Sequence, residues 1–240
     1  TLTRSHWKTK RRKTVSKRKT EFRRTQRLFH RLMEAYATPP EMTVSQWADQ
    51  YRMLSPEASA ERGRWRTDRA PYQREIMDAV GDPRVERVVV KSSAQVGKTE
   101  ILLNTIGYYM DYDPAPMMYI QPTEGMAESF SKDRLSPMIR DCPVLAGKIL
   151  DTSDKRKGNT TFHKSFPGGH ITMIGANAPS KLASRPIRVL LLDEVDRFPV
   201  SAGREGDPVA LAVKRTTTFW NRKVLEVSTP TIKGESRIDK

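Results

Sequence analysis

The stretch that most constrains this chain is residues 88–99, which read VVVKSSAQVGKT. Three valines form a β-branched run, a turn of small residues follows, and apolar residues then recur at helical spacing between positions 101 and 109. A strand, a short loop and a helix that opens with Gly-Lys-Thr form the pattern of a phosphate-binding loop. We therefore expect the loop's backbone N–H groups and the helix N-terminus to bind a phosphate anion.

Two side chains of this loop carry specific chemistry. Lys98 is expected to reach the β- and γ-phosphates of ATP, and the Thr99 hydroxyl is expected to bind Mg²⁺. The first glycine of the usual pattern is replaced by Ser92, so the loop must turn there without the conformational freedom of glycine. The predicted nucleotide-binding residues of the loop are Lys91, Ser92, Ser93, Ala94, Gln95, Val96, Gly97, Lys98 and Thr99.

An acidic pair follows a second apolar run, residues 187–192. A continuous apolar run of this length indicates a parallel strand that is covered on both faces. Asp193 and Glu194 then stand at its C-terminal end, where ligands collect in open α/β sheets. We predict that Asp193 holds the Mg²⁺ shell and that Glu194 orients and polarises the water that attacks the γ-phosphate.

A tyrosine and a glutamine precede the phosphate loop, in the segment Pro71-Tyr72-Gln73. The Gln73 amide can pair with the donor and acceptor edge of adenine, and the Tyr72 ring offers a surface for stacking. We interpret the two residues as a candidate base-binding element.

Hydroxyl groups follow another expected strand, residues 223–227. Ser228, Thr229 and Pro230 come directly after it, and a hydroxyl at that position can sense the γ-phosphate and signal to a nucleic-acid site. We predict these three as coupling residues; the alternative is an ordinary turn that ends the strand.

The order of the expected elements defines the fold class. Strands and helices alternate, and three strands end in polar motifs, which predicts an α/β domain with a mostly parallel sheet flanked by helices. We expect helices over residues 73–80, 123–140 and 207–220, the second broken or kinked at Pro137, and a hairpin around Pro167-Gly168-Gly169. Thr43 with Gln46 forms a capping box before a further helix.

The positive charge is concentrated at the N-terminus. The chain carries a net charge of +15, and residues 1–31 hold thirteen Lys and Arg against one acid, Glu21, which gives them +12. Such an arm indicates a polyanionic partner, nucleic acid first, and the alternative is a solubilising tail. Within it, residues 20–37 have apolar side chains at near-helical spacing. We predict a basic arm with an amphipathic helix over residues 1–40 and a P-loop ATPase domain over residues 41–240.

Composition excludes several other classes. The single cysteine, Cys142, excludes a disulfide framework and a thiolate metal cluster, and it fits a reducing cytoplasm. No apolar run reaches membrane-spanning length, so we expect no membrane partner. The chain begins without Met, and we expect it to be a fragment whose ATPase domain is truncated at its C-terminal end.

With these motifs assembled, the chain from about Thr43 onward resembles the ATPase part of tailed-phage terminase large subunits of the lambda-like GpA family. The segments that carry the resemblance, beyond the phosphate loop, are Trp47-Ala48, Leu54-Ser55-Pro56-Glu57, Gly63-Arg64-Trp65, Pro71-Tyr72-Gln73-Arg74-Glu75-Ile76-Met77, Gln121-Pro122-Thr123, Leu182-Ala183-Ser184-Arg185-Pro186, Leu192-Asp193-Glu194-Val195-Asp196-Arg197 and Ser228-Thr229-Pro230.

The resemblance implies an additional-strand, RecA-like P-loop motor with a conserved catalytic glutamate. In the family such a motor moves double-stranded DNA into a procapsid through the portal, in the host cell cytoplasm. The implied partners are double-stranded DNA, the portal and procapsid, the small terminase subunit, and further copies of the chain assembled on the portal. The family also carries a C-terminal nuclease domain, which we do not expect in this chain.

Two residue roles depend on that resemblance. Arg185 lies near where trans-acting arginines lie in related packaging motors, so it is the expected arginine finger; Arg134 and Arg197 are the alternatives. The family often places the loop lysine at the start of the loop, and this chain has a lysine at both positions, Lys91 and Lys98. The choice between the two lysines stays open at this point.

Two other classes compete with this interpretation. A superfamily-2 helicase shares the upstream glutamine, the acidic pair and the hydroxyl-rich coupling motif, but it needs a second RecA-like domain for which the chain has no sequence. A non-catalytic nucleic-acid-binding module built on the basic arm would bind DNA without hydrolysing ATP.

Overall fold

The computed structural model describes residues 24–29, 41–57, 61–149, 159–178 and 185–239. The chain divides into two compact units, Thr1–Glu41 and Met42–Lys240. In the first unit, residues 24–29 are helical and exposed, and the rest of the helix expected over residues 20–37 lies outside the described residues. No helix in the described part of the chain is both long enough and apolar enough to cross a membrane.

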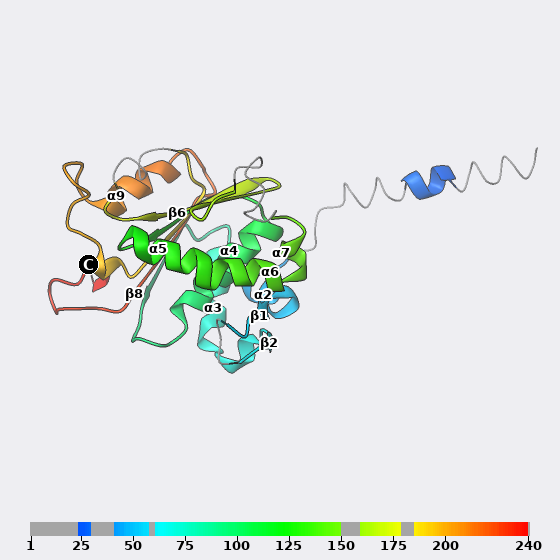
Figure 1. The fold of residues 1–240 in the computed structure, drawn as a ribbon, viewed down its shortest axis with the longest axis horizontal. Helices are drawn as coiled ribbons and strands as arrows, with labels where there is room; N and C mark the ends of the chain where they lie inside the picture. The colour runs from blue at the N-terminus through cyan, green and yellow to red at the C-terminus, as the bar shows by residue number, and fades with distance from the viewer. Residues whose placement is uncertain (1–23, 30–40, 58–60, 150–158, 179–184, 240) are drawn as a thin grey trace, which may run out of the picture. The chain divides into compact units, whose positions relative to one another are not determined.

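The second unit is built on a six-stranded sheet with the order β3-β8-β7-β4-β6-β5 (Figure 1). Neighbouring strands are parallel except for the antiparallel hairpin of β5 and β6. This confirms the predicted mostly parallel α/β sheet. The strands, in chain order, are β3 Arg87–Lys91, β4 Pro116–Gln121, β5 His163–Phe166, β6 Gly169–Gly175, β7 Val189–Asp193 and β8 Lys223–Ser228.

Helices cover both faces of this sheet, and each face has its own apolar core. The larger core packs beneath α2 Val44–Tyr51, α3 Tyr72–Gly81, α4 Lys98–Asp111, α5 Glu124–Phe130, α6 Ser136–Asp141 and α7 Pro143–Ala146. The smaller core packs beneath η4 Val195–Arg197, α9 Pro208–Val213 and η6 Arg237–Asp239 (Figure 1). The remaining short elements are β1 Met53–Leu54, β2 Gly63–Arg64, η1 Thr67–Arg69, η2 Ser131–Leu135 and η5 Lys214–Thr216.

The predicted capping box opens α2 and orients it against α4. The Thr43 hydroxyl accepts from the Gln46 backbone N–H while the Gln46 side chain accepts from the Thr43 N–H. Trp47 is then fully buried, and its indole N–H donates to the Asp111 carboxylate at 2.7 Å. A Cβ atom at Gly107 on α4 would clash with the Trp47 ring, so the close approach of the two helices depends on glycine at that position.

The helix expected over residues 123–140 is observed over residues 124–141, with a π-helical segment just before Pro137. The wider turn accommodates a residue that has no N–H to donate. The helix expected over residues 207–220 ends early, because the Thr216 and Thr217 hydroxyls bond backbone carbonyls three residues back. Such bonds compete with helix continuation.

Candidate active site

Three neighbouring strands end at one edge of the sheet, and each is followed by a predicted motif. Lys98 follows β3, Glu194 follows β7 and Thr229 follows β8. The Lys98 ammonium donates hydrogen bonds to the Thr229 hydroxyl at 2.6 Å and to the Ser93 carbonyl at 2.9 Å. It also lies 3.7 Å from a carboxylate oxygen of Glu194. The residues predicted to activate water and to couple hydrolysis to the nucleic-acid site, Glu194 and Thr229, therefore both lie next to the buried ammonium group of the predicted phosphate-binding residue, Lys98.

The direction of the Glu194 side chain is set largely by its unusual backbone conformation. Its φ angle is 55°, a left-handed conformation that is uncommon for a residue with a side chain. Its Oε2 atom has no hydrogen-bond partner among the described residues, although the Arg197 Nε lies 3.9 Å away. A carboxylate with a free acceptor is suited to receive a proton from water.

Asp193 is held at the end of β7 by two residues of β4. The Tyr119 hydroxyl and the Gln121 amide donate to the same oxygen, Oδ2, at 2.7 Å and 2.8 Å. Burial raises the pKa of Asp193 to about 6, and the Glu194 charge adds to the rise while both hydrogen bonds oppose it. A buried carboxylate of this kind is stabilised by a bound cation, because the cation replaces the solvation lost on burial.

The predicted base-binding residues contact the phosphate loop itself. Both the Tyr72 hydroxyl and the Gln73 amide donate to the Val96 carbonyl, at 3.0 Å and 3.1 Å. Gln73 is buried, and its Oε1 has no hydrogen-bond partner among the described residues. Gly97 follows with φ 78°, and a Cβ atom there would clash with the Gln73 amide. The loop turn and Gln73 are therefore fitted to one another, and the Tyr72 ring remains exposed.

The two candidate loop lysines have different surroundings. Lys98 lies within the loop, as described above, whereas the Lys91 ammonium forms an ion pair with Asp239 of η6 and is 53 % exposed. The backbone at the start of the loop is anchored to β8, because the Ser92 N–H donates to the Ser228 carbonyl at 3.2 Å. In the described structure only Lys98 of the two contacts the other predicted catalytic groups.

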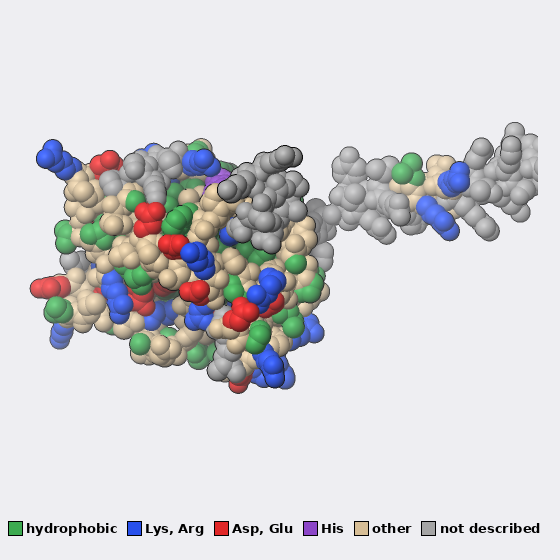
Figure 2. Space-filling model, viewed as in Figure 1, with side chains coloured by type: hydrophobic (Ala, Val, Ile, Leu, Met, Phe, Trp, Pro, Cys, Tyr) green, Lys and Arg blue, Asp and Glu red, His purple; other side chains and the backbone are tan. Residues whose placement is uncertain are grey.

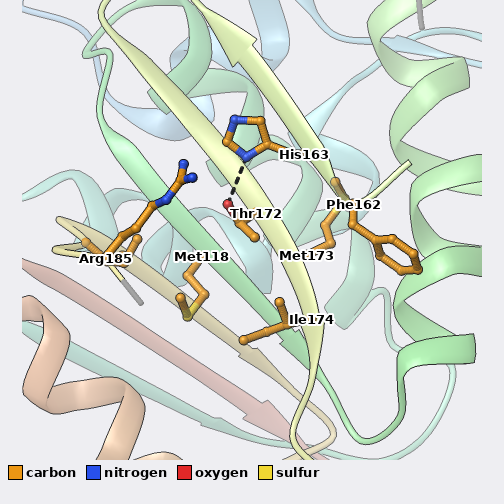
Figure 3. A pocket seen from close by; sticks show the side chains of 8 residues that line it. Met118, Phe162, His163, Thr172, Met173, Ile174 and Arg185 are labelled. Atoms are coloured by element: carbon orange, nitrogen blue, oxygen red, sulfur yellow. Dashed lines mark hydrogen bonds between the residues drawn. The ribbon is translucent and has the colours of Figure 1, made fainter. Parts of the chain in front are cut away.

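Arg185 lies in a different part of the domain from Lys98. It lines a pocket of about 250 Å³ together with residues of β4 and of the β5–β6 hairpin, among them Met118, His163 and Thr172. Figure 3 shows the Arg185 guanidinium on the same side of the hairpin as the His163 ring, which bonds the Thr172 hydroxyl at 3.1 Å. Burial first, and then the charge of Arg185, lower the pKa of His163. Residues 179–184, which precede Arg185, lie outside the described residues.

Sequence reasoning assigned no role to three residues that organise this site, Tyr119, Gln121 and Asp196, although the last two lie in segments that carry the family resemblance. Tyr119 and Gln121 are two positions apart on β4 and so point to one face, next to Asp193. Asp196 bonds the backbone of the segment after β8. The polar alternation at the end of an otherwise apolar strand was the available signal for the first two.

A phosphate loop after one strand, an acidic pair after a second and a hydroxyl motif on the strand between them define an α/β P-loop ATPase. The family model described as "Phage terminase large subunit gpA, ATPase domain" matches residues 59–240, and the chain belongs to this family.

Individual relatives agree with that assignment. The terminase large subunits of Enterobacteria phage P21 and of Escherichia phage lambda are each 32% identical to this chain over 203 residues, which is 84% of this chain. The chain spans only 31% of the length of these relatives. Among solved structures, the HK97 bacteriophage large terminase is similar in fold with a TM-score of 0.62 and 14% identity, covering 78% of this chain and 38% of that one.

Proposed function

We propose that this chain is the ATP-hydrolysing motor part of a terminase large subunit that moves double-stranded DNA into a procapsid in the cytoplasm of the host cell. The observation that carries the proposal is the meeting of Lys98, Glu194 and Thr229 at adjacent strand ends, in a chain of the gpA ATPase family. The proposed partners are double-stranded DNA, the portal and procapsid, the small terminase subunit, and further copies of the chain assembled on the portal.

ATP is the proposed nucleotide, and the loop residues 91–99 are proposed to bind its phosphates. Backbone N–H groups of the loop and of the first turn of α4 surround the β-phosphate, and Lys98 transfers its hydrogen bonds from Thr229 and Ser93 to phosphate oxygens. Tyr72 stacks on the base. The unpartnered Gln73 Oε1 accepts from the exocyclic amine of adenine while its amide keeps the bond to Val96.

Mg²⁺ is the proposed metal, and the chemistry of the available oxygens fits it. Mg²⁺ prefers hard oxygen ligands and retains several waters, and the Thr99 hydroxyl and the Asp193 carboxylate supply such oxygens. Tyr119 and Gln121 both donate to Oδ2 of Asp193, so Oδ1 would be the oxygen available to hold the ion or one of its waters. When bound, the ion would neutralise charge on the β- and γ-phosphates.

Glu194 is the proposed catalytic base, and Ser228-Thr229-Pro230 is the proposed coupling segment. Glu194 Oε2, which has no hydrogen-bond partner among the described residues, orients a water and takes its proton as that water attacks the γ-phosphorus. The bond from the γ-phosphorus to the bridging oxygen breaks, and ADP leaves. The Thr229 hydroxyl and the nucleotide phosphates compete for hydrogen bonds from Lys98. Binding of ATP therefore breaks the bond between Lys98 and Thr229, and that bond forms again after hydrolysis. The position of this segment thus follows the state of the nucleotide.

The superfamily-2 helicase interpretation predicts a different mechanical output from the same chemistry. A double-strand translocase displaces a triplex-forming third strand from an intact duplex when ATP is added, whereas a helicase separates the two strands of the duplex. We expect the terminase assembled on its portal to displace the third strand and to leave a forked duplex paired. Strand separation without triplex displacement would favour the helicase instead.

The basic arm is expected to raise DNA affinity in a salt-dependent and sequence-independent way. Residues 1–31 carry +12 of the net +15, while acidic and basic side chains are interspersed on the face of Met42–Lys240 seen in Figure 2. Each phosphate that a lysine or arginine neutralises releases counterions, so binding weakens as salt rises, with a slope of roughly 0.9 per neutralised phosphate. Deletion of residues 1–31 is therefore expected to flatten a plot of log affinity against log salt. An unchanged slope would assign the arm to a protein partner, such as the small subunit.

Arg185 is the proposed arginine finger, acting on the nucleotide of a neighbouring copy. Arg185 lies beside β4 and the β5–β6 hairpin, whereas Lys98 follows β3 at the opposite edge of the sheet, and this placement agrees with a role in trans. A guanidinium matches the planar charge of the transferring phosphoryl group, and such fingers supply on the order of 10³–10⁵ in rate. Arg185→Ala is thus expected to slow hydrolysis by the assembled protein at least on the order of 10³-fold and to leave the slow rate of the isolated chain unchanged.

Mixed assemblies test the trans arrangement. Assemblies made only of Arg185→Ala chains, or only of Glu194→Gln chains, are each expected to lack the accelerated rate of hydrolysis, and mixed assemblies are expected to regain part of it. Some interfaces then combine an intact Glu194 from one chain with an intact Arg185 from the next. The same mixtures made with Arg134→Ala or Arg197→Ala compare the two alternative fingers. Full activity of assembled Arg185→Ala chains would remove Arg185 from the mechanism.

A further inference from the structure

One carboxylate, that of Asp196, fastens the segment after β8 to the turn after β7. Its Oδ1 accepts from the Ile238 N–H at 2.8 Å. Its Oδ2 accepts from the Thr231 N–H at 2.9 Å and from the Thr231 hydroxyl at 3.2 Å. A residue of the catalytic turn therefore holds the chain directly after the coupling segment.

The backbone of Asp196 extends this connection to the phosphate loop. Its N–H donates to the Ser228 hydroxyl at 3.2 Å, and that hydroxyl donates to the Thr229 carbonyl at 3.2 Å. The Thr229 hydroxyl accepts from Lys98, which lies 3.7 Å from Glu194. Because Glu194 caps the same 3₁₀ turn that contains Asp196, these contacts form a closed ring.

The backbone conformation of Glu194 connects this closed ring of contacts to catalysis. Glu194 has φ 55°, and its Oε2 has no hydrogen-bond partner among the described residues. Apart from its charge contacts with Lys98 and Arg197, the direction of the Glu194 side chain depends on the turn that follows it. A left-handed residue keeps its conformation only when its surroundings hold it. Asp196 supplies that hold by binding the turn to the end of β8 and the residues after it, at Ser228 and Thr231, and to η6 at Ile238.

We propose that Asp196 is a positioning residue that fixes Glu194 in its catalytic direction and links it to the coupling segment. The inference rests on the proposed function, because it assigns Glu194 and Thr229 the roles given above. When ATP takes Lys98 away from Thr229, the shift passes through Ser228 and Asp196 to the turn that carries Glu194. Asp196 touches neither nucleotide nor water in this scheme.

A matched set of variants distinguishes a role of Asp196 in positioning Glu194 from a role that only attaches the segment after β8 to the domain. Asp196→Ala removes the whole connection, and Asp196→Asn keeps one of the two acceptor oxygens. Arg237→Ala is the control: it loosens η6 by removing the contacts of Arg237 with Asp207 and Pro199 but leaves Asp196 intact. Each variant is assayed for ATP hydrolysis, for affinity for a non-hydrolysable ATP analogue, for Tm, and for hydrogen exchange with and without the analogue.

We expect Asp196→Ala to lower kcat on the order of 10²-fold with little change in KM or in analogue affinity, since a small misplacement of a catalytic group costs about that much. Asp196→Asn falls between it and the wild type, and Arg237→Ala stays within about fivefold of the wild type. In the wild type and in Arg237→Ala, we expect analogue binding to change the hydrogen-exchange rates of residues 194–197 and of residues 228–231 together. In Asp196→Ala, we expect the exchange rate of one of these segments to change without that of the other.

Two results would overturn the inference. Equal loss of rate and of Tm in Asp196→Ala and Arg237→Ala would show that Asp196 only fastens the chain. Exchange at the two segments that remains linked in Asp196→Ala would show that another contact carries the signal. Failure of the proposed function itself is distinguishable, because the wild type would then neither bind the analogue nor hydrolyse ATP.

Discussion

Replacing Glu194 by glutamine is expected to remove hydrolysis and to spare nucleotide binding. Gln has nearly the shape of Glu but cannot take a proton from water, and a positioned base contributes typically 10²–10⁴-fold to a rate. We therefore expect kcat to fall on the order of 10³-fold, while the affinity for ATP stays within the range of the wild type. Single-turnover hydrolysis and equilibrium binding of a fluorescent ATP analogue measure the two quantities separately.

The matched control is Glu100→Gln, on the first turn of α4. Glu100 forms an ion pair with the buried Arg52 at 3.0 Å, on the same first turn as Lys98, so its loss tests the effect of removing a nearby carboxylate to which no catalytic role is assigned. A kcat for Glu194→Gln close to that of Glu100→Gln would contradict the assignment of Glu194 as the base.

The second large effect is expected at Lys98, where substitution weakens binding itself. Lys98 is buried among the loop carbonyl of Ser93, the Thr229 hydroxyl and the Glu194 carboxylate, so its ammonium is already positioned for phosphate. Truncating one partner of a buried, hydrogen-bonded charge pair costs about 2–5 kcal/mol, which for Lys98→Ala corresponds to at least a roughly 30-fold loss of ATP affinity.

Lys91→Ala is the comparison that decides between the two lysines. Lys91 is half exposed and pairs with Asp239, and an exposed pair is worth about 0–1 kcal/mol, so the affinity for ATP is expected to change less than about fivefold. Calorimetric titration of ATP into each variant provides the measurement. If Lys91→Ala abolishes binding and Lys98→Ala does not, the loop lysine is Lys91.

Local patterns predicted the elements of this fold well because each depends on neighbouring residues. The β-branched residues 88–90, the helix after Gly97 and the capping box of Thr43 with Gln46 all lie where the sequence indicated. The π-helical segment before Pro137 and the early end of the helix after Asp207 depend on details of hydrogen bonding that periodicity does not contain.

The order of the strands in the sheet and the hydrogen bonds around Asp193 could not be predicted from local sequence patterns. The last strand of the chain, β8, lies between β3 and β7, and only this order brings Thr229 to Lys98. Tyr119 reaches Asp193 across 74 residues of chain, which no spacing rule reveals. The roles of Lys91 and Arg185 likewise depend on the three-dimensional surroundings of each side chain, which the spacing of residues in the sequence does not contain.

The most direct test of the central claim is the steady-state rate of ATP hydrolysis by this chain, measured with and without linear double-stranded DNA. The proposed motor function predicts Mg²⁺-dependent hydrolysis that double-stranded DNA accelerates and that Glu194→Gln removes in both conditions. DNA binding with no hydrolysis above the Glu194→Gln background, in the presence of Mg²⁺ and DNA, would contradict it and would leave a nucleic-acid-binding module.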